Sequence, residues 1–443
     1  MNVLGIWVET SSFTLFSRSF GIITSMLLLL LLGPRLNHPS SRKLVYFISN
    51  LLAGLSSVFF GLIPLLSPHA QPFAAVLLTI IATNSFIVAF MCFTSYLPII
   101  ARSVHQAHLD DFQKLPPTES DPLLSKPIEQ AIAVEAPSGL SLTIAKINSV
   151  CGVIDCVISV GSSLLLQVVL RRTSLTPLTC ISITGAWWMV ISTISTIGLP
   201  GSAEAARAVD DQPVDPKPMK KQSTFQLLRS LKRLPQMRKL LGAHIIACDL
   251  IMIVPGVLFL YASTRLGLEV SDISVMMMCA YAGAGVWMPC QTWVQAKLHR
   301  TNLQMLIAGI ILALLAPLWG SLSLVSSNLG ILNKWHCWIL SVIFGVASAI
   351  YETYSRSLLS EMTPHGHETS FASLYMLSSR STSFMGNLIL GFILQVTGKY
   401  DYAWVFFGAI SIITLPIFLS LRVNEGVSEA LEYETEESNN ISA

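Results

Sequence analysis

The sequence predicts an all-α protein that crosses a lipid bilayer many times. Eleven apolar stretches are long enough to span a bilayer, and 52% of the residues are hydrophobic. Only 12% are charged, whereas an ordinary soluble domain has about 25%. A helix rises about 1.5 Å per residue and satisfies its own backbone hydrogen bonds, so roughly 20 apolar residues suffice to cross the hydrocarbon core.

The predicted helices follow one another along almost the whole chain. They cover residues 11–32, 44–67, 73–100, 141–168, 178–199, 240–263, 271–294, 302–324, 335–359, 370–397 and 402–421. The first follows Glu9 and the polar sequence Thr10-Ser11-Ser12, which is typical of a helix start. The charged n-region and small-residue cleavage site of a signal peptide are missing there, so we expect this helix to be retained.

Lysine and arginine in alternate loops indicate the orientation. Nineteen lie in loops that share one side of the predicted membrane. Five lie on the other side, namely Arg171, Arg172, Arg265, Lys334 and Lys399. The positive-inside rule therefore places the first side, with the central linker and the C-terminus, in the cytosol.

Five of the predicted helices precede a basic linker at 200–239 and six follow it. A transporter built from two six-helix halves has both termini on one side, whereas eleven helices place them on opposite sides. We therefore expect twelve helices, of which the first is missing through a truncated gene model or a late start codon; the alternative is a true eleven-helix protein. The predicted parts are an N-terminal bundle at 1–199, the cytosolic linker at 200–239, a six-helix bundle at 240–422 and a disordered acidic tail at 423–443.

A polar, proline-containing loop at 103–138 is predicted to be cytosolic and disordered. It contains Glu119, Leu123 and Leu124 in the pattern [DE]xxxL[LI], which sorting adaptors read on proteins bound for lysosomes or vacuoles. The pattern is short, so chance occurrence is the alternative.

Polar side chains inside three predicted helices recur every three or four residues and so share one face of each helix. Charged and amide groups cost several kcal/mol at bilayer depth unless they face protein or water, so these faces are predicted to point inward. The substrate-binding or proton-coupling candidates on them are Asn148, Asp155, Glu352, Arg356, Arg380 and Asn387. The alternative is hydrogen bonding between helices with no substrate involved.

The helix at 240–263 adds Asp249, which lies too deep to reach either membrane surface. Pro255-Gly256 follows it and is a candidate hinge, because proline removes a backbone donor and kinks helices. We rank Asp249 first among the acidic candidates. Glu352 and Arg356 lie four residues apart and are expected to pair.

The sequence argues against several other classes of protein. A net charge of +2 is too small to favour a nucleic-acid partner. The sequence contains no hydrolase, metalloprotease, P-loop or dinucleotide motif, so we expect that the protein is not an enzyme and binds no cofactor. The eight cysteines form neither a CxxC motif nor a cluster with histidine, and we expect no metal site.

Residues 361–375, which read EMTPHGHETSFASLY, carry a family resemblance. They resemble the pattern E-x-x-P-x-G-x-E-x-x-F-F-x-L-Y of the autophagy-related protein 22 family, fungal vacuolar members of the major facilitator superfamily. Supporting matches are Thr10-Ser-Ser-Phe13, Thr94-Ser-Tyr-Leu-Pro98 and Tyr351-x-x-Tyr-x-Arg356. Asn387 departs from the proline that the family has after the glycine at 386.

The resemblance implies a two-bundle permease that exports neutral, leucine-like amino acids from vacuole to cytosol during autophagy by alternating access. In such a permease Asp155 or Asp249 would hold the substrate ammonium and Arg380 its carboxylate. The expected partners are amino acids, the lipid bilayer and sorting adaptors. A competing hypothesis is a transport-inactive relative that acts as a membrane scaffold or receptor.

Overall fold

The structure is a computed structural model of the full chain. It describes residues 2–3, 6–7, 10–36, 39–113, 143–162, 164, 177–199, 231–326, 328–364, 367–397 and 399–442. The dileucine candidates Glu119, Leu123 and Leu124 lie outside these residues, so sorting through them stays a prediction.

The fold is all-α, apart from a two-residue antiparallel ladder between β1 (Asn2–Val3) and β2 (Ile6–Trp7). Each of the eleven predicted helices has a counterpart. They are α1 (Thr10–Leu32), α2 (Pro39–Val58), α3 (Gln71–Gln113), the helix Thr143–Ser162, α5 (Pro177–Gly198), α8 (Pro235–Arg265), α9 (Val270–Lys297), α10 (Asn302–Ser321), α11 (Lys334–Glu361), α12 (Glu368–Thr397) and α13 (Asp401–Leu419). The 3₁₀ turns are η1 (Gly33–Leu36), η2 (Phe59–Leu65) and η3 (Leu322–Leu324).

Length and hydropathy agree with a membrane protein. Within the described residues, nine helical stretches are long and apolar enough to cross a membrane, and Phe20–Leu32 is a shorter apolar helix.

Two predicted helix boundaries and the predicted disorder of the tail need correction. The helix α3 continues to Gln113, into the predicted loop 103–138, and α8 begins at Pro235, inside the predicted linker 200–239. The tail at 423–443 was expected to be disordered because it is acidic, but Val423–Ser442 forms the helix α14. Tertiary contacts decide here, because the α14 residues Gly426 and Ala430 are buried.

The chain forms two compact units. Unit 1 comprises 1–95, 164–230 and 365–384, and unit 2 comprises 96–163, 231–364 and 385–443. The helices α3 and α12 each contribute one stretch to either unit. The predicted division into bundles at 1–199 and 240–422 stays a prediction.

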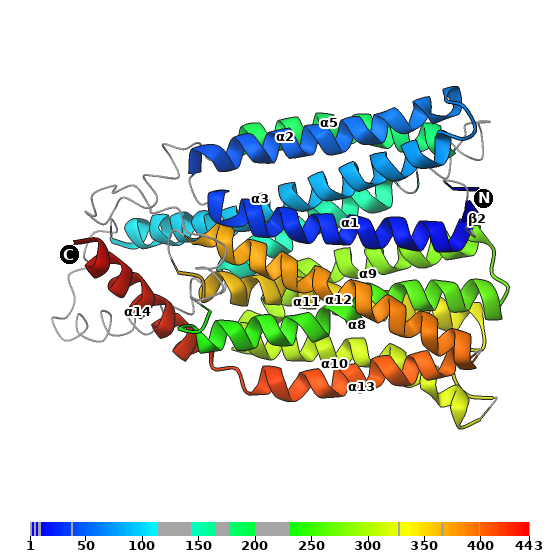
Figure 1. The fold of residues 1–443 in the computed structure, drawn as a ribbon. Coiled ribbons are helices and arrows are strands. Elements are labelled where there is room, and N and C mark those ends of the chain that lie inside the picture. Colours follow the sequence, from blue (N-terminus) through cyan, green and yellow to red (C-terminus); the bar gives the residue numbers. More distant parts are fainter. Residues whose placement is uncertain are drawn as a thin grey trace. The chain divides into compact units, whose positions relative to one another are not determined.

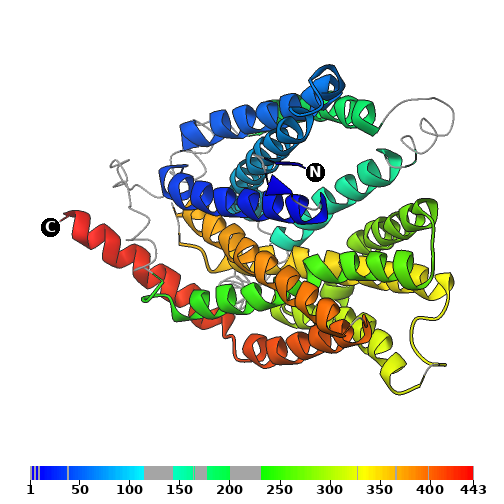
Figure 2. The same ribbon diagram turned by 45° about the vertical axis from the view of Figure 1, so that its right-hand side comes forward.

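In unit 1, α2 and α5 lie side by side, as Figures 1 and 2 show. A Cβ atom on Gly185 would lie 2.8 Å from the carbonyl oxygen of Gly54, so the two backbones touch where both side chains are missing. Hydrogen bonds extend this contact: the hydroxyls of Tyr46 and Ser195 lie 3.0 Å apart. The helix pair is held by close backbone approach and hydroxyl groups, as expected in lipid.

Unit 1 also contains a buried ion pair between α2 and α12. Arg42 and Glu368 have side chains 1% and 4% exposed, and Nη2 lies 3.8 Å from Oε2. The guanidinium also donates to the carbonyl oxygens of Leu36 and Ser95, each at 3.4 Å. Nearby, a Cβ on Gly33 would overlap Ser373 of α12. The start of α12 is thus fixed against the turn between α1 and α2.

In unit 2, α8, α10 and α13 pack along one another, and α11 packs between α9 and α10 (Figure 1). A Cβ on Gly345 would overlap the carbonyl oxygen of Ala280, so the backbones of α11 and α9 lie close together at this point. Between α10 and α13, Gly320 of α10 makes room for the buried indole of Trp404 on α13. The small residues Ala280 and Gly283 of α9 therefore serve helix packing against α11.

Candidate functional site

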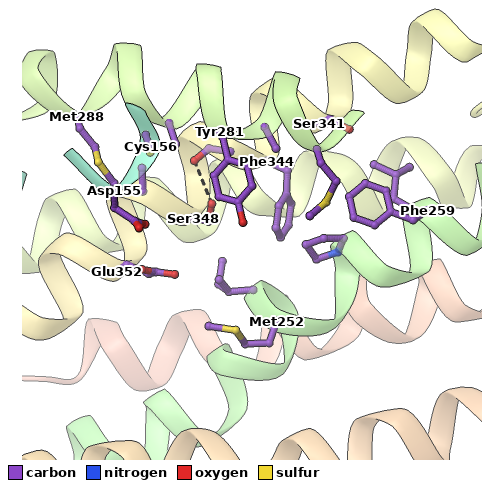
Figure 3. Close-up of a pocket in the computed structure, with 18 residues that line it drawn as sticks. Asp155, Cys156, Met252, Phe259, Tyr281, Met288, Ser341, Phe344, Ser348 and Glu352 are labelled. Atoms are coloured by element: carbon purple, nitrogen blue, oxygen red, sulfur yellow. Dashed lines mark hydrogen bonds between the residues drawn. The ribbon is translucent and has the colours of Figure 1, made fainter. Parts of the chain in front are cut away.

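A cavity of about 220 Å³ lies in unit 2, between the helix Thr143–Ser162 and the helices α8, α9 and α11. Figure 3 shows its lining side chains converging from these four helices. The face of α11 that lines it carries Ser341, Gly345, Ser348 and Glu352 at spacings of three or four residues, and Glu352 is one of the candidates predicted from the sequence. Glycine at 345 lets α9 lie close to α11. The polar side chains on the same face of α11 point into the cavity.

One end of the cavity is acidic. Asp155 and Glu352 both line it, and Figure 3 shows their carboxyl groups directed into the same region. Glu352 accepts a hydrogen bond from Arg356 Nη2 at 2.5 Å, so the predicted i,i+4 pair forms. The side chain of Arg356 is 18% exposed and that of Glu352 39%. Two carboxylates and one guanidinium leave this end with an excess negative charge when all three are ionised.

The other end of the cavity is apolar. Figure 3 shows Phe344 and Phe259 on the side away from the two carboxylates, with the hydroxyl-bearing ring of Tyr281 between. Met252 and Met277 add further apolar lining. Methionine adapts its shape to irregular ligands, and aromatic rings offer broad apolar contact area.

The helix α8 continues through Pro255, which also lines the cavity. Proline has no N–H to donate to the carbonyl of Ile251, another lining residue. The backbone of α8 is therefore weakened at the cavity wall, where the sequence predicted a hinge.

The cavity volume limits the size of a ligand. Pockets for drug-sized ligands hold about 300–1,000 Å³. A small metabolite with one charged end and one apolar end fits both the volume and the lining.

A buried polar layer joins the same helices beside the cavity. Asn148 Nδ2 lies 3.3 Å from both the Thr353 carbonyl oxygen and Ser357 Oγ. Gln291 Nε2 of α9 donates to Ser149 Oγ at 2.9 Å and to Thr353 Oγ1 at 3.0 Å. These bonds tie the helix Thr143–Ser162 to α9 and α11, so Asn148 serves helix contact in this structure.

The remaining sequence candidates have different positions. Asp249 lies near the middle of α8, but its side chain and that of Asn387 are outside the described set. Arg380 is half-buried on the part of α12 that belongs to unit 1. The roles assigned to these three residues stay predictions.

Sequence reasoning missed the aromatic and methionine side chains of the cavity and the amide of Gln291. The rule that flagged other polar groups at bilayer depth also applies to Gln291, which lies within the predicted helix 271–294 and is fully buried. Nothing in the periodicity distinguishes Tyr281 or Phe344 from residues that face lipid.

The sequence comparison identifies relatives over nearly the whole chain. Residues 1–431 match the family described as "Vacuole effluxer Atg22 like". Autophagy-related protein 22 of Cryptococcus neoformans is 24% identical over 97% of this chain and 85% of its own length. Autophagy-related protein 22-1 of Aspergillus niger is 25% identical over 98% of this chain and 76% of its own length.

Solved structures of major facilitator superfamily transporters share the fold. The proton:xylose symporter XylE, bound to 6-bromo-6-deoxy-D-glucose, superimposes with a TM-score of 0.63 at 10% identity, covering 93% of this chain and 87% of XylE. A bacterial homologue of the iron transporter ferroportin, in an outward-facing state, gives a TM-score of 0.61 at 13% identity, covering 93% of this chain and 91% of the homologue.

Proposed function

The chain belongs to the Atg22-like family of vacuole effluxers, and we propose that it exports neutral, leucine-like amino acids from the vacuole to the cytosol during autophagy. It is a membrane permease with a major facilitator fold. Alternating access moves a substrate by exposing one central site to each side of the membrane in turn.

The observation that carries this proposal is the two-ended cavity of unit 2. A zwitterionic amino acid with an apolar side chain has an ammonium group that suits the carboxylate of Asp155 and a side chain that suits Phe259, Met277 and Phe344. A charge-assisted hydrogen bond to Asp155 would set the orientation, and the apolar wall would select the side chain.

The test is leucine efflux from isolated vacuoles that contain or lack this protein. Asp155→Asn keeps the size of the side chain and removes its charge, so we expect efflux to fall at least tenfold at normal abundance, equivalent to about 1.4 kcal/mol. Asp249→Asn is expected to behave in the same way.

The matched control is Asp272→Asn, the same chemical change in the first turn of α9, away from the cavity lining. It should leave efflux within twofold of the parent. Normal efflux by Asp155→Asn would refute the ammonium site. Equal leucine efflux with and without the protein would refute amino-acid export and favour the scaffold hypothesis.

A further inference from the structure

The helix α8 begins without a cap of its own. Its N-cap residue, Leu234, makes no side-chain capping bond, and Pro235 has no N–H. The first backbone donor is therefore the N–H of Gln236, and it donates to Glu429 Oε2 of α14 at 3.0 Å. A carboxylate far along the chain thus supplies the cap and complements the helix dipole.

The side chain of Gln236 makes two more contacts with the segment that enters α14. Its Nε2 donates to Glu425 Oε2 at 2.8 Å, and its Oε1 accepts from the backbone N–H of Arg422 at 3.2 Å. Gln236 is only 5% exposed. One buried residue at the start of α8 therefore binds three groups of the C-terminal segment.

The same face of α14 also touches the end of α11. A Cβ on Gly426 would overlap Sδ of Met362, the C-cap residue of α11, and would lie 3.2 Å from Cβ of Gln236. Figure 2 shows α14 crossing the start of α8. At Gly426, α14 therefore lies close against both helices at once.

Both helices held in this way line the cavity. α8 contributes Met252, Pro255 and Phe259, and α11 contributes Ser348 and Glu352. We propose that α14 is a strap that holds the start of α8 against the end of α11 and thereby slows opening of the cavity at that end. This proposal does not depend on which substrate the cavity takes.

The strap proposal predicts which contacts hold α14 in place. The Gln236 and Gly426 contacts are buried, whereas the outer ion pair, Arg233 with Glu436 at 2.9 Å, has side chains 62% and 63% exposed. Exposed ion pairs contribute little, since water screens them. Arg233→Ala is therefore a matched control on the same two segments.

The experiment uses the full-length protein in lipid nanodiscs and two readouts by mass spectrometry. Hydrogen exchange measures the docking of α14, and iodoacetamide alkylation of Cys156, a buried cavity residue, measures cavity opening. Cys290, which is exposed, and Cys337, which is fully buried and outside the cavity lining, are alkylated in the same sample as internal references.

Gln236→Leu and Gly426→Val should each raise α14 amide exchange at least tenfold and Cys156 alkylation at least fivefold, with Cys290 and Cys337 unchanged. Glu429→Ala, a change on the strap itself, should do the same and avoids altering α8. Arg233→Ala should leave both readouts within twofold of the parent.

Two results would overturn the proposal. Unchanged α14 exchange in all three variants would show that these contacts do not hold the helix. Increased α14 exchange without increased Cys156 alkylation, or with an equal increase at Cys337, would show that α14 does not restrain the cavity. Neither readout requires transport. A negative result would therefore refute the strap without refuting the proposed amino-acid export.

Discussion

At the scale of single residues, Arg42 of unit 1 holds a charge that is almost completely shielded from solvent. Its guanidinium is buried and faces Glu368 at 3.8 Å. Removing one partner of a buried ion pair leaves the other charge uncompensated in a low dielectric, at a cost of about 3–5 kcal/mol. Replacing both partners removes that penalty.

We therefore predict that Arg42→Leu lowers the thermal stability of the purified protein strongly, whereas Arg42→Leu combined with Glu368→Leu restores most of it. Unfolding followed by tryptophan fluorescence in detergent measures both variants and completes a double-mutant cycle with Glu368→Leu. Additive effects in this cycle would show that the two side chains do not interact.

At the scale of elements, the contact between α9 and α11 leaves no room for a side chain. Gly345→Ala would place its Cβ against the Ala280 carbonyl, so the helices must separate. Overpacking of this kind costs about 1–3 kcal/mol, and the cavity between the same helices should lose ligand affinity as well. Thermal unfolding checks the first effect.

Gly256→Ala is the control for this change, because a Cβ on Gly256 of α8 meets nothing within 4 Å. It should be neutral or slightly stabilising, since alanine favours the helix. Similar destabilisation by both variants would contradict the packing argument.

The docking of α14 is predicted to be sensitive to acid. A hydrogen bond from Arg422 lowers the pKa of the Glu425 carboxyl below its ordinary value of 4.5 and raises the pKa of the Arg422 guanidinium. The amide of Gln236 and the charge of Lys239, both on α8, lower the Glu425 pKa further, so docking on α8 contributes to the shift. A carboxyl whose pKa is lowered on docking contributes fully above pH 4.5 and loses its contribution as the pH falls through the lowered value.

Amide exchange of α14, corrected for the intrinsic pH dependence, should therefore be constant from pH 7 to 5 and rise only once the pH falls below 4.5. Glu425→Gln should flatten this rise. A rise that begins near pH 6 would instead point to histidine and contradict the assignment.

The sequence predicted the helices well because the bilayer imposes one length and one composition on each of them. It failed at α14 and at the start of α8, where contacts between distant residues replace lipid as the determining factor. It also ended α3 too early. The glutamates of α14 suggested disorder, yet Glu425 and Glu429 bond to Gln236, about 190 residues away.

The same reason limits what could be predicted of the site. Periodicity alone placed Asp155 and Glu352 on inward faces, because charge at bilayer depth has few alternatives. Apolar side chains are stable both in lipid and in a protein interior. Phe259 and Phe344 therefore could not be assigned to the cavity without the helix arrangement.

At the scale of the whole molecule, the lysine and arginine distribution predicts the orientation. We expect the linker at 200–239 and α14 to face the cytosol, and Met1 of this chain to face the vacuole lumen. Protease added to sealed vacuoles should cut between Gly201 and Thr224 and spare an N-terminal epitope. Cleavage of that epitope would refute the assigned orientation of the N-terminus.

The pairing of Arg42 with Glu368 also has a consequence for biosynthesis. The two residues are 326 positions apart (368 − 42), so a ribosome working at about 5–20 residues per second needs roughly 15–65 seconds to supply the carboxylate after the arginine has been made. During that interval the arginine, in the first turn of α2, can keep its charge at the membrane surface. A nascent chain interrupted before α12 would therefore carry this cation without its glutamate.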